Sequence, residues 1–531
     1  LQTAKTRSRK QCEGGRVGRG AMDSLSLSVL TSWRALNDEQ LAESLAKLNS
    51  ASVMQFKFGV PTDVRKELSS LISDRCLDDS PSLAPLRCAA LETVRILSRD
   101  PSGLETLLSD DVIRLTLRSS QLAQLSPAEV GLQELTEATK ALVNSLFHSS
   151  RVRQLFLELK CDNGLRLRLT SSSPAVISLR YLDLHVAFII SAKERPLQNE
   201  WRADISFVSA LCGIVREGEE TWKDEALKVL FNLLCHAHFK IDDRTTREVT
   251  ESCLVHILSV PPHPTVFQNC VNLLATTPAL ADLICPEVPP SSPSSFDGRE
   301  MKATQAILDD LDAKLSTAEK EKGSDTLAMM GTYFTVLINI CVACKQARRY
   351  CRLKIIPPLT SADVHRPPET GDTLRNRIIR VMQSVSHTRE LAAQFLFVLC
   401  KRSVNRLIKY SGLGHAAGLL ANSGLLGRIN DPPHPSDSED SETEDYKEVQ
   451  SEVNPVTGYI RPEKGPNPLE GMTEEQKEYE AMKLVNAMDE MMRLGVVKPG
   501  TIGEDGKPRE VSHVLELTKD IHGDSNSSDE D

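Results

Sequence analysis

An asparagine recurs at one place in four apolar segments of the chain. The segments 142–146 (LVNSL), 230–234 (LFNLL), 270–274 (CVNLL) and 337–341 (LINIC) carry Asn144, Asn232, Asn272 and Asn339. An amide side chain offers a donor and an acceptor, which suits the backbone of a peptide laid along a row of such residues. The alternative is that these residues cap turns or face solvent. Because four occurrences fall in register, we favour peptide binding.

Three basic side chains extend this row. Arg95 and His185 fall at equivalent places in two further apolar segments, and Arg99 follows Arg95 by one helical turn. Guanidinium groups bind carboxylates well. Arg95 and Arg99 are therefore candidates to receive a carboxylate or the C-terminus of a peptide, with an ordinary solvated face as the alternative.

Two serines lie in a strongly acidic run at 436–445. Ser436 and Ser441 each have a glutamate three residues later, which is the substrate pattern of acidophilic kinases such as casein kinase II. A phosphate adds about −1.5 to −2 charges and can pair with clustered arginines. We predict that such a cluster is formed by Arg348, Arg349 and Arg352; the alternative is a solvated basic face.

Catalytic and metal-binding motifs are missing from the sequence. Gly506-Lys507 is followed by Pro508 and not by Ser or Thr, and no His-Glu-x-x-His occurs. We interpret Cys341-x-x-Cys344, which has no second pair, as two buried core cysteines. We therefore predict no catalytic residue, no metal and no cofactor.

The segments that carry these residues have helical periodicity. Apolar positions recur every three or four residues in 86–97, 135–147, 226–234, 326–342 and 391–399, and strict alternation is almost absent. The first steps between equivalent positions, from Arg95 to Asn272, fit the ~40–47-residue period of armadillo or HEAT repeats. Two longer steps contain insertions, 286–297 and 357–372, which we expect to be loops. The predicted fold is an all-α, armadillo/HEAT-like, right-handed superhelical solenoid.

Charge divides the chain unevenly. The net charge is −10, yet 429–531 contains 26 acidic and 10 basic residues, while the first 21 residues are basic. A folded part without a basic excess argues against a nucleic-acid partner. No apolar run reaches the ~18–20 residues of a membrane span. The thirteen scattered cysteines suggest a reduced, intracellular chain. Residues 1–21 resemble a transit peptide, but we favour sequence upstream of a true start at Met22.

Beyond 428 the apolar repeats stop. We predict a disordered basic segment at 1–21, a solenoid at 22–428, an acidic phosphorylatable linker at 429–470, an amphipathic helix at 471–495 and an acidic disordered tail at 496–531. A capping box at 473–476 opens the helix. Its apolar face includes Leu484, Val485 and Met488. Nothing nearby in sequence packs on this face, so we expect it to bind the solenoid or a partner.

Several stretches resemble the synembryn (resistance to inhibitors of cholinesterase) family. They are VRILSRD (94–100), LRNRIIRVM (374–382), AAQFLFVLC (392–400), IKYSGLGHAAGLLA (408–421), DYKE (445–448), NPVTG (454–458) and PNPLEGMTEEQKEYEAMKLVN (466–486). The resemblance covers roughly 86–500 and is densest in 370–490.

The resemblance implies a guanine nucleotide exchange factor and folding chaperone for heterotrimeric G-protein α subunits (Gα), without covalent chemistry. Such proteins act on GDP-bound Gα free of βγ and stabilise the nucleotide-free state. Their groove takes the C-terminal helix of Gα, and their tail helix reaches its Ras-like domain. By position, Arg95, Arg99 and Asn144 match groove residues, Ser436 and Ser441 match phosphorylation sites, and Arg348 and Arg352 match phosphate-receiving residues. Two departures are His185, where relatives carry Arg, and Ser441, where they carry Thr.

The competing interpretation is a passive armadillo adaptor that binds an extended or helical peptide in its groove. Such an adaptor would share the asparagine row but should lack the 471–495 helix. For the exchange factor we expect a monomer in the cytoplasm, recruited to the plasma membrane or cell cortex through Gα.

Overall fold

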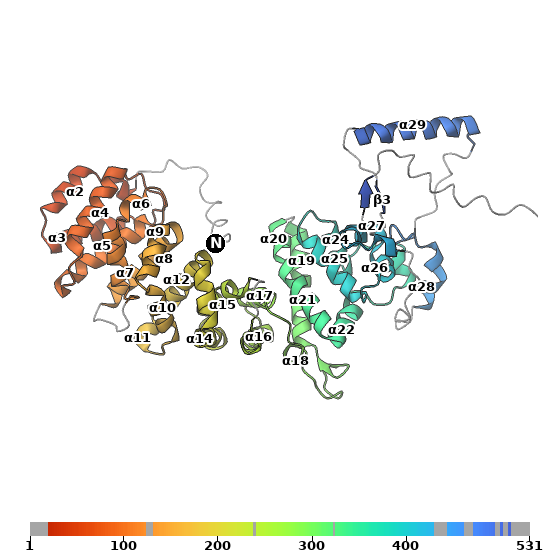
Figure 1. The fold of residues 1–531 in the computed structure, drawn as a ribbon, viewed down its shortest axis with the longest axis horizontal. Helices are drawn as coiled ribbons and strands as arrows, with labels where there is room; N and C mark the ends of the chain where they lie inside the picture. The colour runs from red at the N-terminus through yellow and green to blue at the C-terminus, as the bar shows by residue number, and fades with distance from the viewer. Residues whose placement is uncertain are drawn as a thin grey trace, which may run out of the picture. The chain divides into compact units, whose positions relative to one another are not determined.

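A computed structural model describes residues 20–123, 131–236, 241–321, 324–429, 443–460, 471–493, 500–502 and 508–510. In these residues the chain is helical nearly throughout, and its strands form only two short hairpins (Figure 1). The chain divides into two compact units. Unit 1 comprises Leu1–His256 with Pro262–Thr276, and unit 2 comprises Ile257–Pro261 with Thr277–Asp531. No described helix has the length and apolar character that a membrane crossing requires.

Unit 1 is built of short helices joined by tight turns. They are η1 (Ala21–Ser24), α2 (Leu27–Arg34), α3 (Asp38–Ala51), α4 (Thr62–Cys76), η2 (Pro81–Leu83), α5 (Ala84–Leu97), α6 (Leu104–Leu107), α7 (Asp110–Ser119), α8 (Leu132–His148), α9 (Ser150–Glu158), α10 (Cys161–Thr170), α11 (Pro174–Ile177), α12 (Arg180–Lys193), α13 (Arg195–Ala203), α14 (Ile205–Glu217), α15 (Glu220–Leu234), α16 (Asp243–Ile257, ending one residue beyond the unit) and α17 (Pro264–Leu274).

One helix from each repeat of unit 1 stacks on its counterpart in the next. In this row α3 contacts α5, α5 contacts α8, α8 contacts α12, α12 contacts α15 and α15 contacts α17. A second layer forms where α4 contacts α7, α7 contacts α9 and α10 contacts α14. Each helix buries its apolar face on the neighbouring repeats, as in armadillo and HEAT arrays. The predicted all-α, armadillo-like fold is confirmed by this two-layer stacking.

Helix α5 illustrates how sequence sets the exposed face. Pro85 lies in its first turn, where the missing amide hydrogen costs nothing. Leu91 and Val94 are fully buried, while Arg95 on the adjoining face is half-buried. A turn at 100–103 follows, with Gly103 in the left-handed region at φ 69°. The row of stacked helices therefore keeps one polar edge accessible.

Unit 2 continues the helical pattern with more irregular connections. Its elements are α18 (Ala281–Ile284), β1 (Ser295–Phe296), β2 (Arg299–Glu300), α19 (Lys302–Glu321), α20 (Ser324–Met329), α21 (Gly331–Ala343), α22 (Lys345–Ile355), α23 (Ser361–Val364), α24 (Leu374–Gln383), α25 (Thr388–Leu399), α26 (Val404–Ser411), α27 (Leu413–Asn422), η3 (Leu426–Arg428), α28 (Glu444–Val449), η5 (Gln450–Glu452), α29 (Glu474–Arg493), β3 (Gly500–Ile502) and β4 (Pro508–Glu510). Helix α25 packs against α21, α24 and α27.

Three segments differ from the sequence-based expectation. The helical pattern at 326–342 is split between α20 and α21, where the Thr388 hydroxyl donates to the Leu327 carbonyl at 2.8 Å. The insertion 286–297 is not a plain loop, because β1 and β2 form a hairpin with Asp297 and Gly298 both at positive φ. Two successive residues at positive φ favour a two-residue hairpin turn. Within 496–531, where we expected disorder, β3 pairs antiparallel with β4.

Part of the predicted linker folds onto unit 2. We call residues 443–460 the strap. Its carbonyls at Pro455 and Val456 accept the backbone N–H groups of Leu413 and Gly414, each at 2.9 Å, and so satisfy amides that the first turn of α27 leaves unpaired. The Ile460 N–H donates to the Val364 carbonyl at 2.7 Å. The strap therefore joins the insertion at 357–372 to the start of α27.

Candidate partner-binding site

The predicted asparagine row connects neighbouring helices of unit 1. The Asn144 Nδ2 on α8 donates to the Arg95 carbonyl on α5 at 3.1 Å, and the Asn232 Nδ2 on α15 donates to the Phe188 carbonyl on α12 at 3.1 Å. Both residues are half-buried. Within the part of the chain that the structure describes, neither Oδ1 accepts a hydrogen bond. Each residue therefore links two repeats and keeps one acceptor for a donor from outside.

The other two asparagines lie in different surroundings. Asn272 on α17 accepts from the Gln268 amide at 3.0 Å and approaches Asn269 at 3.4 Å, so it belongs to a side-chain network on its own helix. Asn339 is half-buried on α21 and lies in unit 2. Unit 1 thus holds Asn144, Asn232 and Asn272 of the predicted row.

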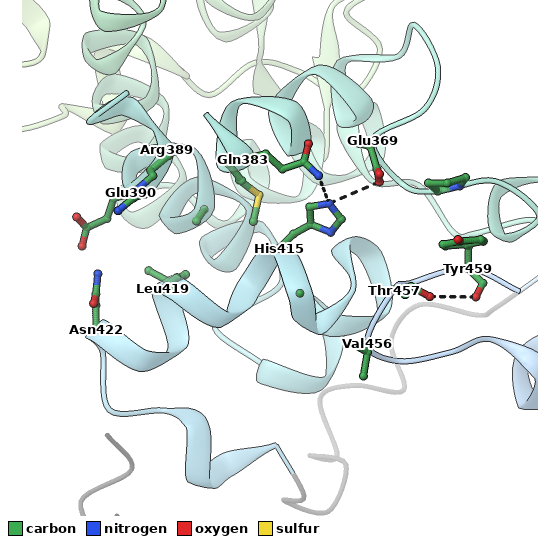
Figure 2. A pocket seen from close by; sticks show the side chains of 15 residues that line it. Glu369, Gln383, Arg389, Glu390, His415, Leu419, Asn422, Val456, Thr457 and Tyr459 are labelled. Carbon is green, nitrogen blue, oxygen red and sulfur yellow. Dashed lines mark hydrogen bonds and ion pairs between the residues drawn. The ribbon is translucent and has the colours of Figure 1, made fainter. Parts of the chain in front are cut away.

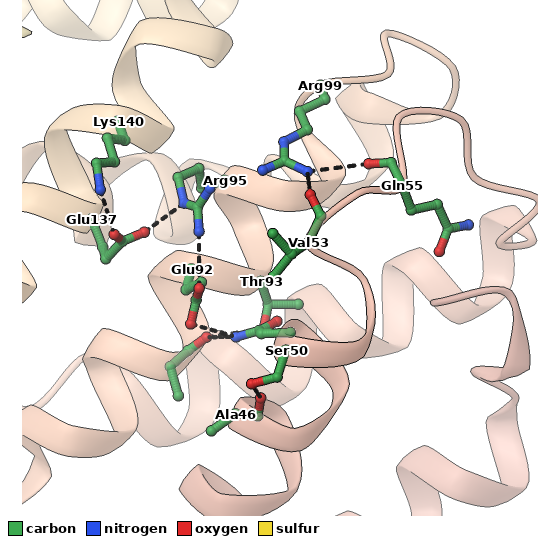
Figure 3. Close-up of polar contacts among 12 residues, drawn as sticks. Ala46, Ser50, Val53, Gln55, Glu92, Thr93, Arg95, Arg99, Glu137 and Lys140 are labelled. Carbon is green, nitrogen blue, oxygen red and sulfur yellow. Dashed lines mark hydrogen bonds and ion pairs between the residues drawn. The ribbon is translucent and has the colours of Figure 1, made fainter. Parts of the chain in front are cut away.

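Arg95 lies in a chain of alternating charges (Figure 3). Its Nη2 pairs with Glu92 at 2.9 Å and its Nε pairs with Glu137 of α8 at 2.5 Å. Lys140 pairs with the other oxygen of Glu137 at 2.9 Å. These four side chains sum to no net charge. Arg95 is therefore a hydrogen-bonding residue held in place by two carboxylates, and an incoming anion would have to compete with them.

Arg99 has no such carboxylate. Its Nη1 donates to the carbonyls of Val53, at 2.7 Å, and Gln55, at 3.2 Å (Figure 3). Burial, followed by the charge of Arg95, lowers the pKa of Arg99, although an arginine remains protonated. No described carboxylate lies within ion-pair distance of it. Of the two predicted arginines, Arg99 is thus the one whose charge an anion could neutralise.

His185, at a position where the resemblance implies an arginine, faces an acid. Its Nδ1 lies 3.4 Å from Glu225 Oε2, and Lys228 pairs with Glu225 at 3.0 Å and with Asp224 at 2.6 Å. Burial alone would raise the pKa of Glu225, but the neighbouring His185 and the Lys228 charge outweigh it and lower that pKa. Between α12 and α15, this cluster repeats the alternating charges found between α5 and α8.

The predicted phosphate-receiving arginines lie on α22 in unequal surroundings. Arg349 pairs with Asp297 at 2.6 Å, and its guanidinium lies 5.8 Å from the centre of the Phe296 ring. Arg348 donates to the Cys341 carbonyl at 3.2 Å, and Arg352 is buried. The β1–β2 hairpin therefore already supplies a carboxylate to this cluster. Ser436 and Ser441 lie outside the described residues.

The predicted tail helix exists as α29. Leu484 is 61% exposed, while Val485 and Met488 are half-buried. Two further large side chains, Tyr479 and Met482, are also more than half exposed. Such a face buries little apolar surface within the chain and fits a partner surface.

A pocket of about 610 Å³ in unit 2 was not predicted (Figure 2). Helices α24, α25 and α27 line it, together with the strap residues Val456, Thr457 and Tyr459. His415 Nδ1 lies 2.7 Å from the Ser411 carbonyl, and the Gln383 amide nitrogen lies 2.6 Å from His415 Nε2. Both ring nitrogens are thus occupied, which leaves no free base. Gly414 and Gly418, one turn apart on one wall, are the sequence signal that we overlooked.

The described part of the chain supplies no cluster suited to a metal. No group of three or more His, Cys, Asp or Glu side chains comes together there. Cys341 and Cys344 are buried free thiols.

Comparisons with known proteins agree over most of the chain. "Chaperone ric-8" of Caenorhabditis elegans is 38% identical over 537 residues, spanning 90% of this chain and 94% of the relative. "Chaperone Ric-8A" of Danio rerio is 34% identical, spanning 88% and 92%. A solved structure described as a phosphorylation-switched cadherin–β-catenin interaction is similar over 77% of this chain and 72% of its own, with 13% identity and a TM-score of 0.49. That likeness is weak and adds nothing to the stacking described above.

The family profile named Ric8, guanine nucleotide exchange factor synembryn, matches residues 90–507. This range includes α8 to α27, the strap and α29, and so covers both the asparagine row and the tail helix. The chain belongs to the Ric8 (synembryn) family.

Proposed function

We propose that this chain is a guanine nucleotide exchange factor and folding chaperone for Gα subunits. It binds GDP-bound Gα free of βγ, promotes GDP release and stabilises the nucleotide-free state. Membership of the Ric8 family over 90–507 is the observation that carries this proposal. The partner and exchange activity come with the family, and the exposed apolar side chains of α29 fit a chain that works by binding.

The proposed mechanism is a population shift without a covalent step. A protein that binds nucleotide-free Gα more tightly than GDP-bound Gα must weaken GDP binding by the same factor. In this proposal unit 1 takes the C-terminal helix of Gα. The free Oδ1 atoms of Asn144 and Asn232 accept hydrogen bonds from it, and Arg99 receives its terminal carboxylate.

Helix α29 would then hold the opened Ras-like domain through Leu484, Val485 and Met488. The exposure of Leu484 supports this role, because an isolated amphipathic helix gains most of its stability from the surface on which it packs. The complex would be one chain bound to one Gα, at the cytoplasmic face of membranes where Gα resides.

Phosphorylation of Ser436 and Ser441 by an acidophilic kinase such as casein kinase II is the proposed regulation. The phosphates would pair with the arginines of α22. Because Arg349 already pairs with Asp297, a phosphate would have to displace the Asp297 carboxylate or share the Arg349 guanidinium with it. Arg348 donates to a neutral carbonyl, that of Cys341, and is therefore the better first receiver of a phosphate.

A nucleotide-exchange assay tests the proposed function. GDP-loaded Gα is mixed with the full chain, and uptake of a labelled non-hydrolysable GTP analogue is followed. We expect faster uptake, and we expect it to be lost in a variant that lacks residues 471–495. If the full chain leaves uptake unchanged and binds another protein tightly, the adaptor interpretation replaces this one.

A further inference from the structure

The β1–β2 hairpin is preceded by two consecutive β-turns, each with a proline at its second position. The Ser292 N–H donates to the Pro289 carbonyl at 2.9 Å, and the Ser295 N–H donates to the Ser292 carbonyl at 3.0 Å. Pro290 and Pro293 therefore stand where a φ fixed at about −65° suits a turn. Both prolines are exposed, and Ser292 between them is half-buried. The chain thus presents Ser292 on an ordered surface turn.

The sequence around Ser292 is the substrate pattern of proline-directed protein kinases. Such kinases select a serine or threonine that is followed by proline, and a second proline two residues before the acceptor strengthens the pattern. Residues 290–293 read Pro-Ser-Ser-Pro, with Ser292 as the acceptor. Four other Ser-Pro or Thr-Pro pairs lack the second proline, and their acceptors are Ser80, Ser126, Ser173 and Thr277. Ser292 therefore fits this class of kinase better than any other position of the sequence.

The Ser292 hydroxyl lies in a short polar network that ends on β2. Its Oγ lies 3.4 Å from the Ser294 Oγ, and the Ser294 hydroxyl donates to Glu300 Oε2 at 2.6 Å. Lys302 pairs with the same oxygen at 3.1 Å. Burial would raise the pKa of Glu300, but the Ser294 hydroxyl and Lys302 outweigh it and lower that pKa. Glu300 is therefore held as a carboxylate close to the group that a kinase would modify.

The hairpin connects this network to α22. Glu300 belongs to β2, which pairs with β1. At the hairpin turn, Asp297 pairs with Arg349 at 2.6 Å. The centre of the Phe296 ring lies 5.2 Å from that of the Tyr350 ring. A change of charge beside Glu300 therefore acts on the element that occupies Arg349.

We propose that Ser292 is a phosphorylation site for a proline-directed kinase, and that its phosphate loosens the β1–β2 hairpin from α22. In this step the Ser292 Oγ bonds to the γ-phosphorus of ATP, and the bond from that phosphorus to the β–γ bridging oxygen breaks. ADP leaves, and the hydroxyl proton passes to the catalytic base of the kinase. The site goes beyond the proposed function, and only the release of Arg349 for another phosphate rests on it.

The charges beside the network decide the direction of the effect. The flanking charged side chains already form two pairs, Arg299 with Glu287 at 2.9 Å and Lys302 with Glu300 at 3.1 Å, and so they sum to zero. A phosphate adds about −1.5 to −2 charges and competes with the Glu300 carboxylate for the Ser294 hydroxyl. Lys302 is 64% exposed, and an exposed ion pair contributes little. Repulsion between the phosphate and Glu300 therefore outweighs the attraction of Lys302.

The first test is phosphorylation of the full chain by an activated mitogen-activated protein kinase with ATP, with the phosphate located by mass spectrometry. We expect the phosphate on Ser292, its loss in Ser292→Ala, and slower incorporation in Pro290→Ala, which keeps the acceptor. Ser173 is the matched control within the same chain, because it is exposed and precedes a proline but has Ser171 two residues earlier. No phosphate on Ser292, or equal rates on Ser292 and Ser173, would overturn the site.

The second test is hydrogen–deuterium exchange of residues 286–300 before and after phosphorylation. We expect protection to be lost at the Val288 N–H and the Glu300 N–H. These groups donate to the carbonyls of Gly298 and Pro286, each at 2.9 Å. In Glu300→Gln, phosphorylation should change the protection less, because the like charge is gone.

Two outcomes separate this site from the proposed function. Unchanged or greater protection of 286–300 in the phosphorylated chain would overturn the loosening of the hairpin. If both tests succeed while the chain fails to accelerate nucleotide uptake by Gα, the proposed function fails and the Ser292 site stands.

Discussion

The asparagine row allows a structural role to be separated from a binding role. Asn144→Ala removes one hydrogen bond, the 3.1 Å contact from Nδ2 to the Arg95 carbonyl. That carbonyl still accepts the Ser98 hydroxyl at 2.9 Å, so no buried acceptor is left unpaired. The expected loss in the free energy of unfolding is therefore only the net value of one hydrogen bond, about 0.5–1.5 kcal/mol.

Asn49 provides a matched control on the same row of helices. It is fully buried, donates to the Ala89 carbonyl at 2.9 Å and to the Glu92 carboxylate at 3.3 Å, and accepts the Thr93 hydroxyl at 2.9 Å. Asn49→Ala removes all three bonds and leaves a cavity, so we expect a larger loss in the free energy of unfolding, about 2–3 kcal/mol. A buried side chain cannot contact a partner, and the peptide affinity of folded Asn49→Ala should be unchanged.

The assay combines urea unfolding, followed by circular dichroism, with anisotropy of the Gα C-terminal peptide. If the Oδ1 of Asn144 accepts a hydrogen bond from the peptide, Asn144→Ala weakens binding by roughly 3- to 10-fold, corresponding to about one hydrogen bond. If Asn144→Ala loses stability but keeps its peptide affinity, the row only joins repeats and the groove interpretation is refuted.

Three further predictions concern stability. Arg87→Met should lower the free energy of unfolding by about 3–5 kcal/mol, because it leaves the Glu134 carboxylate buried without its partner between α5 and α8. The Arg87 and Glu134 side chains are only 6% and 4% exposed. Gly458→Ala should destabilise the strap by about 1–2 kcal/mol, since φ is 76° and the added Cβ would lie 3.0 Å from a backbone nitrogen, whereas Gly418→Ala has open space. The Ser361 N–H lowers the pKa of Asp445, so hydrogen-exchange protection of the strap should persist above about pH 4 and fall as the pH drops through that lowered pKa.

Each of these predictions has an outcome that contradicts it. Replacing both Arg87 and Glu134 by apolar residues should restore part of the lost free energy of unfolding, measured with urea. A double variant that is less stable than Arg87→Met would refute the argument from the unpaired Glu134 carboxylate. Equal losses of strap protection in Gly458→Ala and Gly418→Ala would refute the backbone-strain argument. If Asp445→Asn leaves the acid-induced loss unchanged, another carboxylate causes it.

The helices and the face that each buries were largely predictable from the sequence. Periodicity places α5, α8 and α25 close to their observed bounds and places the end of α15, because each buries a continuous apolar face. The polar contacts were not predictable. The partner of Asn144 is a carbonyl 49 residues earlier, and the pattern of one segment carries no information on which repeat lies beside it.

The pairing of Arg349 with Asp297 shows the same limit over 52 residues. Here a local signal was available, since Asp-Gly between Phe296 and Arg299 favours a two-residue hairpin. The proline- and serine-rich composition around it suggested a loop and concealed that signal. The strap was missed for a related reason, because an acidic stretch that forms no core of its own can still pack on a core formed elsewhere.

The strap also forms a closed loop on unit 2. At one end the Thr443 hydroxyl donates to the Leu359 carbonyl, and at the other the Ile460 N–H donates to the Val364 carbonyl, so both ends are held on the same insertion. Closing a loop costs conformational entropy, which the contacts at its ends must offset. Cutting the chain inside the strap would remove the closure, and each half could then detach from unit 2 without the other.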